Sequence, residues 1–457
     1  MYDERPERRP VNPRRKRRSR IQIIKEDYLP VIIIAIGIVL IFTFIIGSIV
    51  RGVQKKRYER DIAHRNLLAS QQAQAALENE AADLMEKADL LAAQFNYVGA
   101  LEILDQFSGD MYAFPEFSAK YTAYVEANNK LVLWEDPNTV LNLSFHPLVA
   151  DPSRAFAGTS FYKEHYITVD EFNRILKQLY ENGYMLVRYS DVVGKDGKME
   201  IRLPAGKRPL IITETQVNYN VDLVDSDNDG LPDKNGRGFA HRLMLDENGE
   251  LTCEIVDKDG KFISGAYDIV PILDAFIKSH PDFSYRGAKA VLALSGHDGL
   301  FGYRTSSSSP EATREAQIAE VKKVIDAIKS SGYELACYTY SNKSYKELST
   351  EGIKTEMQMW NSEVTPLLGN VDLFVFAKGD DIADSGTQYA GDKFEVLKSC
   401  GFTGYIGFGN DGKSWFNAYA DHSRMGRIMV TGSNLQSHPE WFESIFDAYS
   451  IKDSARN

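Results

Sequence analysis

The sequence predicts an α/β barrel that follows a membrane-spanning helix and a helical stalk. A long charge-free run near the N-terminus indicates the membrane helix. Helical periodicity without strand patterns follows it, and from residue 131 short β-branched and aromatic runs alternate with helical segments. We therefore divide the chain into a basic arm (1–27), a membrane helix (28–50), a stalk (51–130), a barrel (131–450) and a tail (451–457).

Residues 28–50 contain no charged side chain. At about 1.5 Å per helical residue, this run crosses the hydrocarbon core of a bilayer, which needs about 20 apolar residues. It is too long for the core of a signal peptide, and no small-residue cleavage pattern follows it before Arg51. Ten Lys or Arg residues precede the helix and six follow it closely, a distribution that favours a cytoplasmic N-terminus. We expect a single-pass protein of the cell membrane with its main domain outside the cell.

The charge distribution argues against a nucleic-acid partner. The whole chain has a net charge of −11, although residues 1–60 carry 15 basic and 6 acidic side chains. The remaining residues are thus strongly acidic and would repel nucleic acid. The basic arm lies beside a membrane helix, where setting the topology is the simpler role. The three cysteines are too few and too scattered for a disulfide framework.

In the stalk the pattern is helical from residue 53 to about 129, and Ala and Leu recur at three- and four-residue steps between residues 67 and 88. Residues 88–104 predict a helix, a tight turn and a second helix, a pattern that resembles one tetratricopeptide-type hairpin. One hairpin is weak evidence, because such arrays need about three repeats to bury a core. Two interpretations stay open, a plain spacer, which we favour, and a docking site for a protein partner.

Eight short apolar runs predict the strands of the barrel, namely 140–145, 184–189, 210–213, 290–295, 333–339, 371–377, 402–408 and 427–430. Helices are expected between them at 169–182, 269–279, 311–330 and 393–399. Eight strands in this alternation fit a barrel better than an open doubly wound sheet, because no glycine-rich nucleotide fingerprint follows the first strand. Several strands end in polar residues, and the carboxyl ends of barrel strands are where function is concentrated.

Several motifs in this region carry a family resemblance, among them His-Pro-Leu at 146–148, Ile-Thr-Val-Asp-Glu-Phe at 167–172, His-Pro-Asp-Phe-Ser-Tyr-Arg-Gly-Ala-Lys at 280–289 and Gly-Tyr-Arg-Thr at 302–305. Over about two-thirds of its length the chain resembles the polysaccharide deacetylases of the NodB-homology family, in particular their membrane-anchored Gram-positive branch. The resemblance implies a distorted (β/α) barrel of the polysaccharide deacetylase type. It also implies the removal of acetyl groups from cell-wall polysaccharide or peptidoglycan.

The residues at the family's catalytic positions are substituted. The family's Asp pair, which supplies a base and a metal ligand, corresponds to Thr215 and Gln216, and its two metal-binding histidines correspond to Tyr338 and Asn342. Zinc prefers imidazole, thiolate and carboxylate, and a threonine hydroxyl is no general base near neutral pH. We therefore expect no transition metal, and we interpret the protein as a pseudoenzyme that binds wall glycan or a protein partner.

The alternative is an active carbohydrate deacetylase with a rearranged metal site. His146 and His297 would supply its imidazoles, and Glu214 or Asp298 its carboxylate. Against this, His146 belongs to an ordinary loop of the family, and Glu214 would point away from the cleft because neighbouring strand residues alternate sides. Arg304 matches a family position, where it either orients a group in the cleft or packs.

A separate motif suggests calcium. Asp225, Asp227 and Asp229 occupy positions 1, 3 and 5 of a loop whose position 9 is Asp233, an arrangement that resembles the calcium loops of dockerins and thrombospondin-type repeats. Position 12 is Gly236, so the bidentate glutamate of such loops is missing. We expect a weak structural calcium site, and an acidic surface turn is the alternative.

Overall fold

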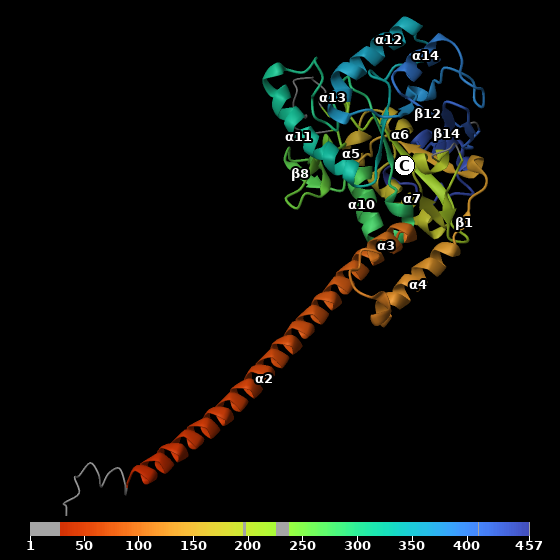
Figure 1. Ribbon diagram of the computed structural model, residues 1–457. Helices are drawn as coiled ribbons and strands as arrows, with labels where there is room; N and C mark the ends of the chain where they lie inside the picture. The colour runs from red at the N-terminus through yellow and green to blue at the C-terminus, as the bar shows by residue number, and fades with distance from the viewer. Residues whose placement is uncertain (1–27, 195–197, 225–236, 410, 457) are drawn as a thin grey trace, which may run out of the picture. The chain divides into compact units, whose positions relative to one another are not determined.

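The computed structural model describes residues 28–194, 198–224, 237–409 and 411–456 (Figure 1). The chain divides into two compact units, Met1–Glu80 and Ala81–Asn457. The described part of the first unit is helical and belongs to α2, which runs over Leu29–Ala92. The expected helix at 28–50 is therefore present, and the helix continues because no Gly or Pro occurs between residues 53 and 92.

Among the described residues, α2 is the one helix that is long and apolar enough to cross a membrane, judged by its length and composition. Its large apolar side chains between Val31 and Val50 are exposed in the unit. Exposure of so much aliphatic surface to water is unfavourable, at about 25 cal/mol per Å². A lipid bilayer would cover this surface.

The second unit begins with a small helical core. The end of α2, α3 (Tyr97–Leu104) and α4 (Pro115–Asn129) bury six side chains together, namely Ala81, Leu84, Ala88, Ala100, Leu104 and Phe117. The side chain of Asn96 starts α3 by accepting a hydrogen bond from Gly99 N at 3.1 Å. The helix, turn and helix expected at 88–104 are present, and α4 supplies the third helix against which they pack.

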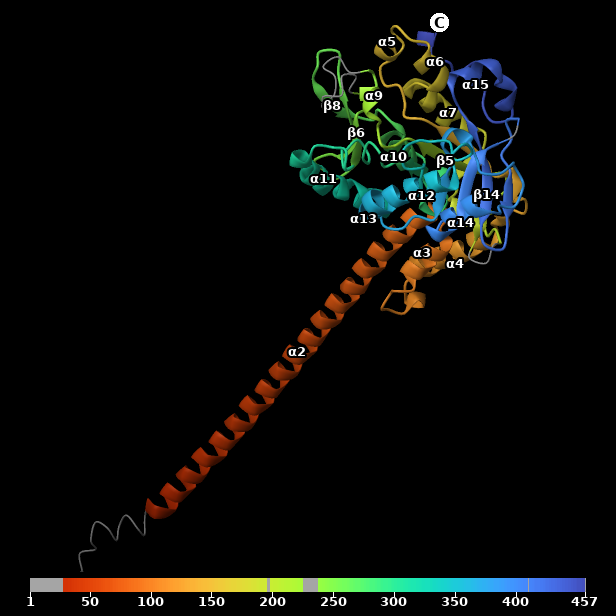
Figure 2. The same cartoon turned by 90° about the horizontal axis from the view of Figure 1, so that it is seen from above.

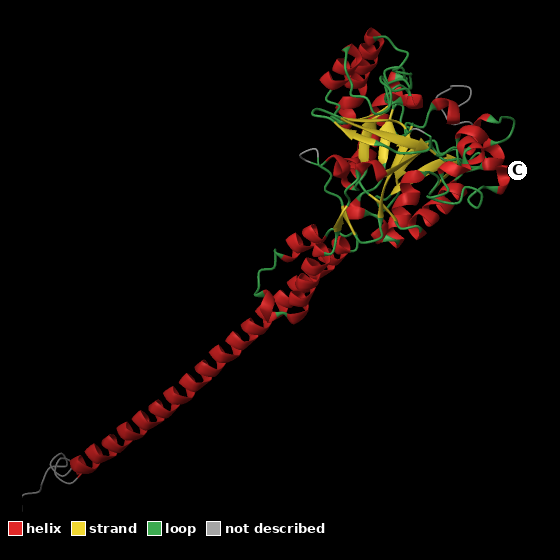
Figure 3. Cartoon of the chain, turned by 90° about the vertical axis from the view of Figure 1, so that its right-hand side faces the viewer, coloured by secondary structure: helices red, strands yellow, loops and turns green. Residues whose placement is uncertain are grey.

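Seven parallel strands form a closed barrel (Figure 3). Their order around the ring is β2 (Leu141–Phe145), β5 (Arg208–Thr215), β9 (Val291–Leu294), β10 (Glu334–Cys337), β11 (Leu373–Val375), β12 (Gly404–Phe408) and β14 (Ser423–Met429). β14 pairs with both β12 and β2, which closes the ring. The predicted α/β barrel is confirmed.

The expectation of eight barrel strands is wrong by one. The remaining strand, β3 (Tyr184–Leu186), pairs with residues 208–210 of β5, whereas β9 pairs with residues 213–215 of the same strand. β2 pairs with β5 over residues 210–214. β9 pairs with the part of β5 beyond its contact with β3, so the next strand of the ring is β9. β3 is therefore short and pairs with a single strand of the ring.

The interior of the barrel is apolar. Helices pack around the outside of the barrel (Figures 2 and 3). Strand residues alternate between the two, so that Val291 and Ala293 belong to the inner cluster while Leu292 and Leu294 pack in the outer one. The outer helices include α7 (Val169–Glu181), α10 (Ile269–Ser279), α11 (Glu311–Ser330), α12 (Thr350–Met359) and α14 (Asp392–Ser399). Their positions agree with the four predicted helices, and α12 is additional.

Shorter elements complete the unit. β13 (Phe416–Ala418) pairs antiparallel with β14, and β1 (Val132–Leu133) pairs with β4 (Arg202–Leu203). A separate antiparallel sheet, which the sequence did not predict, contains β6 (Arg242–Leu245), β7 (Leu251–Val256) and β8 (Phe262–Gly265). The short helices are α5 (Pro152–Ala155), α6 (Phe161–His165), α8 (Tyr189–Val193), α9 (Val221–Val224), α13 (Thr365–Leu368) and α15 (Gly432–Ser437).

Candidate functional site at the barrel mouth

A cavity of about 660 Å³ lies at the carboxyl ends of the barrel strands. His146 follows β2, Gln216 follows β5, Tyr338 follows β10, and Arg427 is near the end of β14. The ends of parallel strands meet at one rim, so these residues come together although they are far apart in the sequence. Three of the four substituted family positions, Gln216, Tyr338 and Asn342, line the cavity.

The fourth position, Thr215, is buried and holds His146. Its hydroxyl lies 3.1 Å from the carbonyl oxygen of Phe145 and 2.8 Å from His146 Nδ1. The Thr215 hydroxyl has one proton to donate. When Thr215 donates this proton to the Phe145 carbonyl, His146 donates from Nδ1 to the hydroxyl oxygen and keeps a lone pair on Nε2. Burial, with a contribution from the charge of Arg427, lowers the pKa of His146 to about 3, so the ring is neutral. A base with so low a pKa is weak near neutral pH.

The other substituted residues present polar groups to the cavity. Gln216 and Asn342 both have positive φ, 62° and 55°, a backbone conformation that is uncommon for residues other than glycine. Gln216 Oε1 accepts a hydrogen bond from Asn220, and the hydroxyl of Tyr338 accepts one from Lys378 N at 3.3 Å. Asn342 Oδ1 is buried without a partner. These groups are neutral hydrogen-bonding side chains.

Arg427 is a buried cation in the mouth. Its side chain is 1% exposed, and Nη1 and Nη2 donate to the carbonyl oxygens of Ile406 and Phe376 at 3.0 and 2.9 Å. Burial lowers its pKa to about 10, which leaves the guanidinium charged at neutral pH. Sequence reasoning missed this residue. The signal in the sequence was an arginine at the start of the predicted strand at 427–430, whose other residues are apolar.

The mouth does not suit the transition metal that the family resemblance implies. Its possible donors are the imidazoles of His146 and His165, the exposed carboxylate of Glu164, amides and a phenol, and the charge of Arg427 opposes the binding of a cation. Among the described residues, no group of three or more His, Cys, Asp or Glu side chains is placed to hold a metal ion. The absence of a transition metal stays a prediction, and it depends on this donor chemistry.

The residues of the alternative metal site do not share one cavity. Glu214 is buried in the outer layer, where burial and the neighbouring Asp268 raise its pKa well above its usual value. His297 Nδ1 lies 2.9 Å from Asp298 Oδ1, and Arg304 Nη1 donates to the carbonyl oxygen of Asp298. The cavity that contains His146 is not lined by Glu214, His297, Asp298 or Arg304. Arg304 thus holds the loop after β9.

Aromatic rings border the cavity. Phe161 in α6 is 51% exposed, Phe408 at the end of β12 is 39% exposed, and Tyr166 and Trp441 also contribute to the lining. Trp441 stacks against His438 with ring centroids 4.2 Å apart. Rings of this kind offer flat apolar faces beside polar groups. The sequence analysis did not single them out, because most of them come from loops or a short helix without a periodic pattern.

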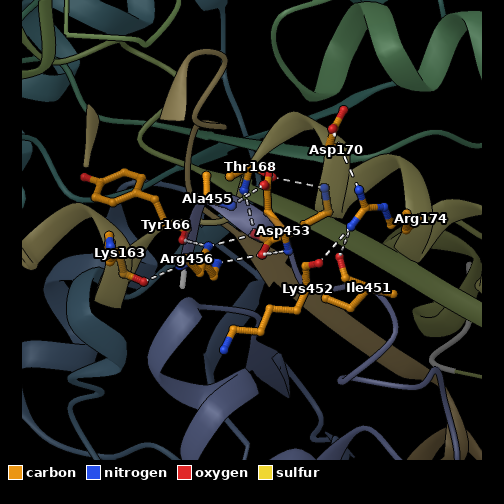
Figure 4. Close-up of polar contacts among 11 residues, drawn as sticks. Lys163, Tyr166, Thr168, Asp170, Arg174, Ile451, Lys452, Asp453, Ala455 and Arg456 are labelled. Carbon is orange, nitrogen blue, oxygen red and sulfur yellow. Dashed lines mark hydrogen bonds and ion pairs between the residues drawn. The ribbon is translucent and has the colours of Figure 1, made fainter. Parts of the chain in front are cut away.

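The last described residues hold one wall of this cavity (Figure 4). Arg456 pairs with Glu171 and donates to the carbonyl oxygens of Lys163 and Tyr166. Thr168 Oγ1 donates to Asp453 Oδ2 at 2.9 Å. The segment that the sequence divides off as a tail is thus bonded to α6 and α7.

The candidate calcium loop cannot be placed. Asp225, Asp227, Asp229 and Asp233 lie outside the described residues, as does the basic arm at 1–27. The calcium site therefore stays a prediction.

No protein-family model and no curated protein matches the chain. Among solved structures, a Streptococcus pyogenes deacetylase, PplD, in complex with acetate, aligns with 65% of this chain and 96% of its own. The alignment has a TM-score of 0.35 and 14% sequence identity. A likeness at this level does not assign the chain to a family.

Proposed function

We propose that this is a single-pass protein of the cell membrane whose deacetylase-like barrel binds cell-wall glycan outside the cell, without metal-dependent deacetylation. The observation that carries the proposal is the cavity at the barrel mouth. It combines exposed aromatic rings with hydrogen-bonding side chains, and its volume is in the range of small-ligand sites. Sugar rings have apolar faces and hydroxyl edges, so they match such a lining.

Binding is favoured over hydrolysis by the chemistry of the mouth. Gln216, Tyr338 and Asn342 supply neutral groups where the resemblance implies metal ligands, and Thr215 holds His146 in place of a carboxylate base. We therefore expect neither a bound transition metal nor a strong base to activate water there. The cavity keeps groups that hold a polar ligand.

The helix at 28–50 supports the membrane location, and the basic residues on its N-terminal side support an extracellular barrel. The three-helix core around Ala88 and Phe117 is compact without a further repeat. This favours a spacer role for the stalk, and a protein partner there is the second interpretation.

The test uses the full chain in detergent micelles with acetylated chito-oligosaccharide and insoluble peptidoglycan. We expect saturable binding without acetate release, and a loss of affinity in Phe161→Ala of about 5- to 10-fold. Phe262→Ala is the matched control, because Phe262 is also exposed, at 57%, but lies on β8 away from the cavity lining. Equal affinities of both variants would contradict binding at the mouth.

Acetate release would favour the alternative function. If the purified chain carries stoichiometric zinc, cobalt or nickel, and if His146→Ala or His297→Ala abolishes acetate release, the protein is an active deacetylase with a rearranged site. Elemental analysis of the same preparation decides between the two proposals.

A further inference from the structure

Arg427 has no carboxylate partner among the described residues, unlike the buried Arg424 and the largely buried Arg456. Arg424, also on β14, pairs with Asp381 at 2.8 Å, and Arg456 pairs with Glu171 at 2.5 Å. Arg427 forms no ion pair with any described residue, and its Nε is buried without a hydrogen-bond partner. An unpaired buried charge is costly to the folded state. Among the described residues no carboxylate contacts this guanidinium, and Asp381, the partner of Arg424, acts on it only from a longer distance.

The guanidinium retains the capacity to hold an anion. Nη1 and Nη2 each donate one N–H to a backbone carbonyl, and the guanidinium also hydrogen-bonds to Tyr338, which leaves part of its five N–H groups for a ligand. The planar fork of arginine matches the two oxygens of a carboxylate. Arg427 lines the cavity, so a ligand in the mouth reaches this side chain.

The neighbouring groups are also donors. The hydroxyl of Tyr338 accepts from Lys378 N, so its own proton is available for an acceptor. Gln216 receives the bond from Asn220 on its oxygen, which leaves its NH₂ group as a donor. The Lys378 ammonium adds positive charge to the lining, whereas Glu164, the one carboxylate among the described lining residues, is exposed on α6.

We propose that the mouth selects glycan units that carry a carboxylate, which pairs with Arg427 at the base of the cavity. This inference rests on the proposed glycan binding and adds its specificity. The aromatic rings at the rim contact the sugar ring, while the carboxylate replaces the missing partner of the guanidinium. Sugars with a lactyl ether and uronic acids both present this group.

The test compares matched sugars by calorimetry on the full chain in detergent micelles. N-acetylmuramic acid differs from N-acetylglucosamine by its lactyl carboxylate, and glucuronic acid differs from glucose by its carboxylate. We expect the acidic member of at least one pair to bind about 10- to 100-fold more tightly, and the preference to fall as salt is raised. The pair that shows the preference identifies the source of the carboxylate.

Arg427→Met tests the residue itself. The acidic and neutral sugars should then bind within about twofold of one another. The melting temperature of this variant should be equal to or above that of the wild type, because an unpaired buried charge is replaced by an apolar side chain of similar length. Arg427→Lys keeps the charge without the planar fork and should keep a reduced preference.

The outcomes separate this inference from the proposed function. Equal binding of acidic and neutral sugars by the wild type would overturn the carboxylate preference and leave glycan binding intact. A preference that survives in Arg427→Met would overturn the role of this arginine. A folded wild-type chain that binds neither member of either pair, nor peptidoglycan, would overturn both.

Discussion

Arg456 and Glu171 form a buried two-point ion pair, with Nε–Oε1 and Nη2–Oε2 distances of 2.5 and 2.7 Å. Glu171 is also the third residue of α7, and it accepts a hydrogen bond from Thr168 N in a capping box. The same guanidinium bonds to the backbone of α6 and to Tyr166, which line the cavity (Figure 4). The C-terminal segment therefore positions one wall of the proposed glycan site.

Arg456→Met should destabilise the barrel by about 3–5 kcal/mol, because Glu171 would remain buried without its cation. The free energy of unfolding in urea measures this loss. Lys177→Met is the control, since Lys177 pairs with Glu181 on the surface of the same helix, and it should change the stability by less than about 1 kcal/mol. Similar values for both variants would show that the buried pair contributes little.

Glu214 and Asp268 make stability depend on pH. Burial raises the pKa of Glu214 well above its usual value and that of Asp268 to about 6. A carboxyl whose pKa is raised by folding stabilises the folded state below its unfolded pKa, and this stability is lost as the pH rises through the folded pKa. The loss should therefore begin near pH 4 and continue through pH 6 and above.

Glu214→Gln should reduce this loss and stabilise the protein by about 1–3 kcal/mol at pH 8, because the amide cannot ionise and offers an N–H to the unpartnered Asp268 Oδ2. Urea unfolding of wild type and variant at pH 4.5, 6 and 8 measures the difference. A difference that shrinks as the pH rises would contradict the assignment.

Thr215→Val should weaken glycan binding by about 2- to 10-fold, since the hydrogen bond that holds His146 is lost. Thr215→Ser keeps the hydroxyl and should restore the affinity. The ¹⁵N chemical shifts of His146 identify its tautomer, and we expect the proton on Nδ1 in the wild type and in the serine variant. A valine variant with unchanged shifts and affinity would exclude this positioning role.

The double substitution Ile38→Arg and Phe42→Arg should prevent stable membrane insertion. Each arginine costs about 2.5–3.5 kcal/mol at the centre of a spanning helix. Alkaline carbonate extraction of cell membranes measures the retained fraction. Ile62→Arg lies on the same helix outside the charge-free run and should leave retention unchanged. Equal retention of both variants would contradict a membrane span at 28–50.

Local patterns in the sequence predicted the positions of the main helices well. The predicted bounds of the helices at 269–279 and 311–330 agree with α10 and α11, because helical periodicity and end signals are carried by nearby residues. Strand alternation also predicted the outward direction of Glu214. His146, Gln216, Tyr338 and Asn342 were found through the family resemblance and through their positions at strand ends, and they line one cavity.

The sequence by itself determined a charge-free helix, a helical stalk and an alternation of strands and helices, since each of these depends on neighbours within a few turns. Only the tertiary structure decided that seven strands close the ring, that Arg427 is buried there with no described carboxylate in contact, and that Trp441 and Phe161 border the same cavity. These facts depend on strand pairing and on contacts between residues far apart in the chain. No local pattern records such contacts.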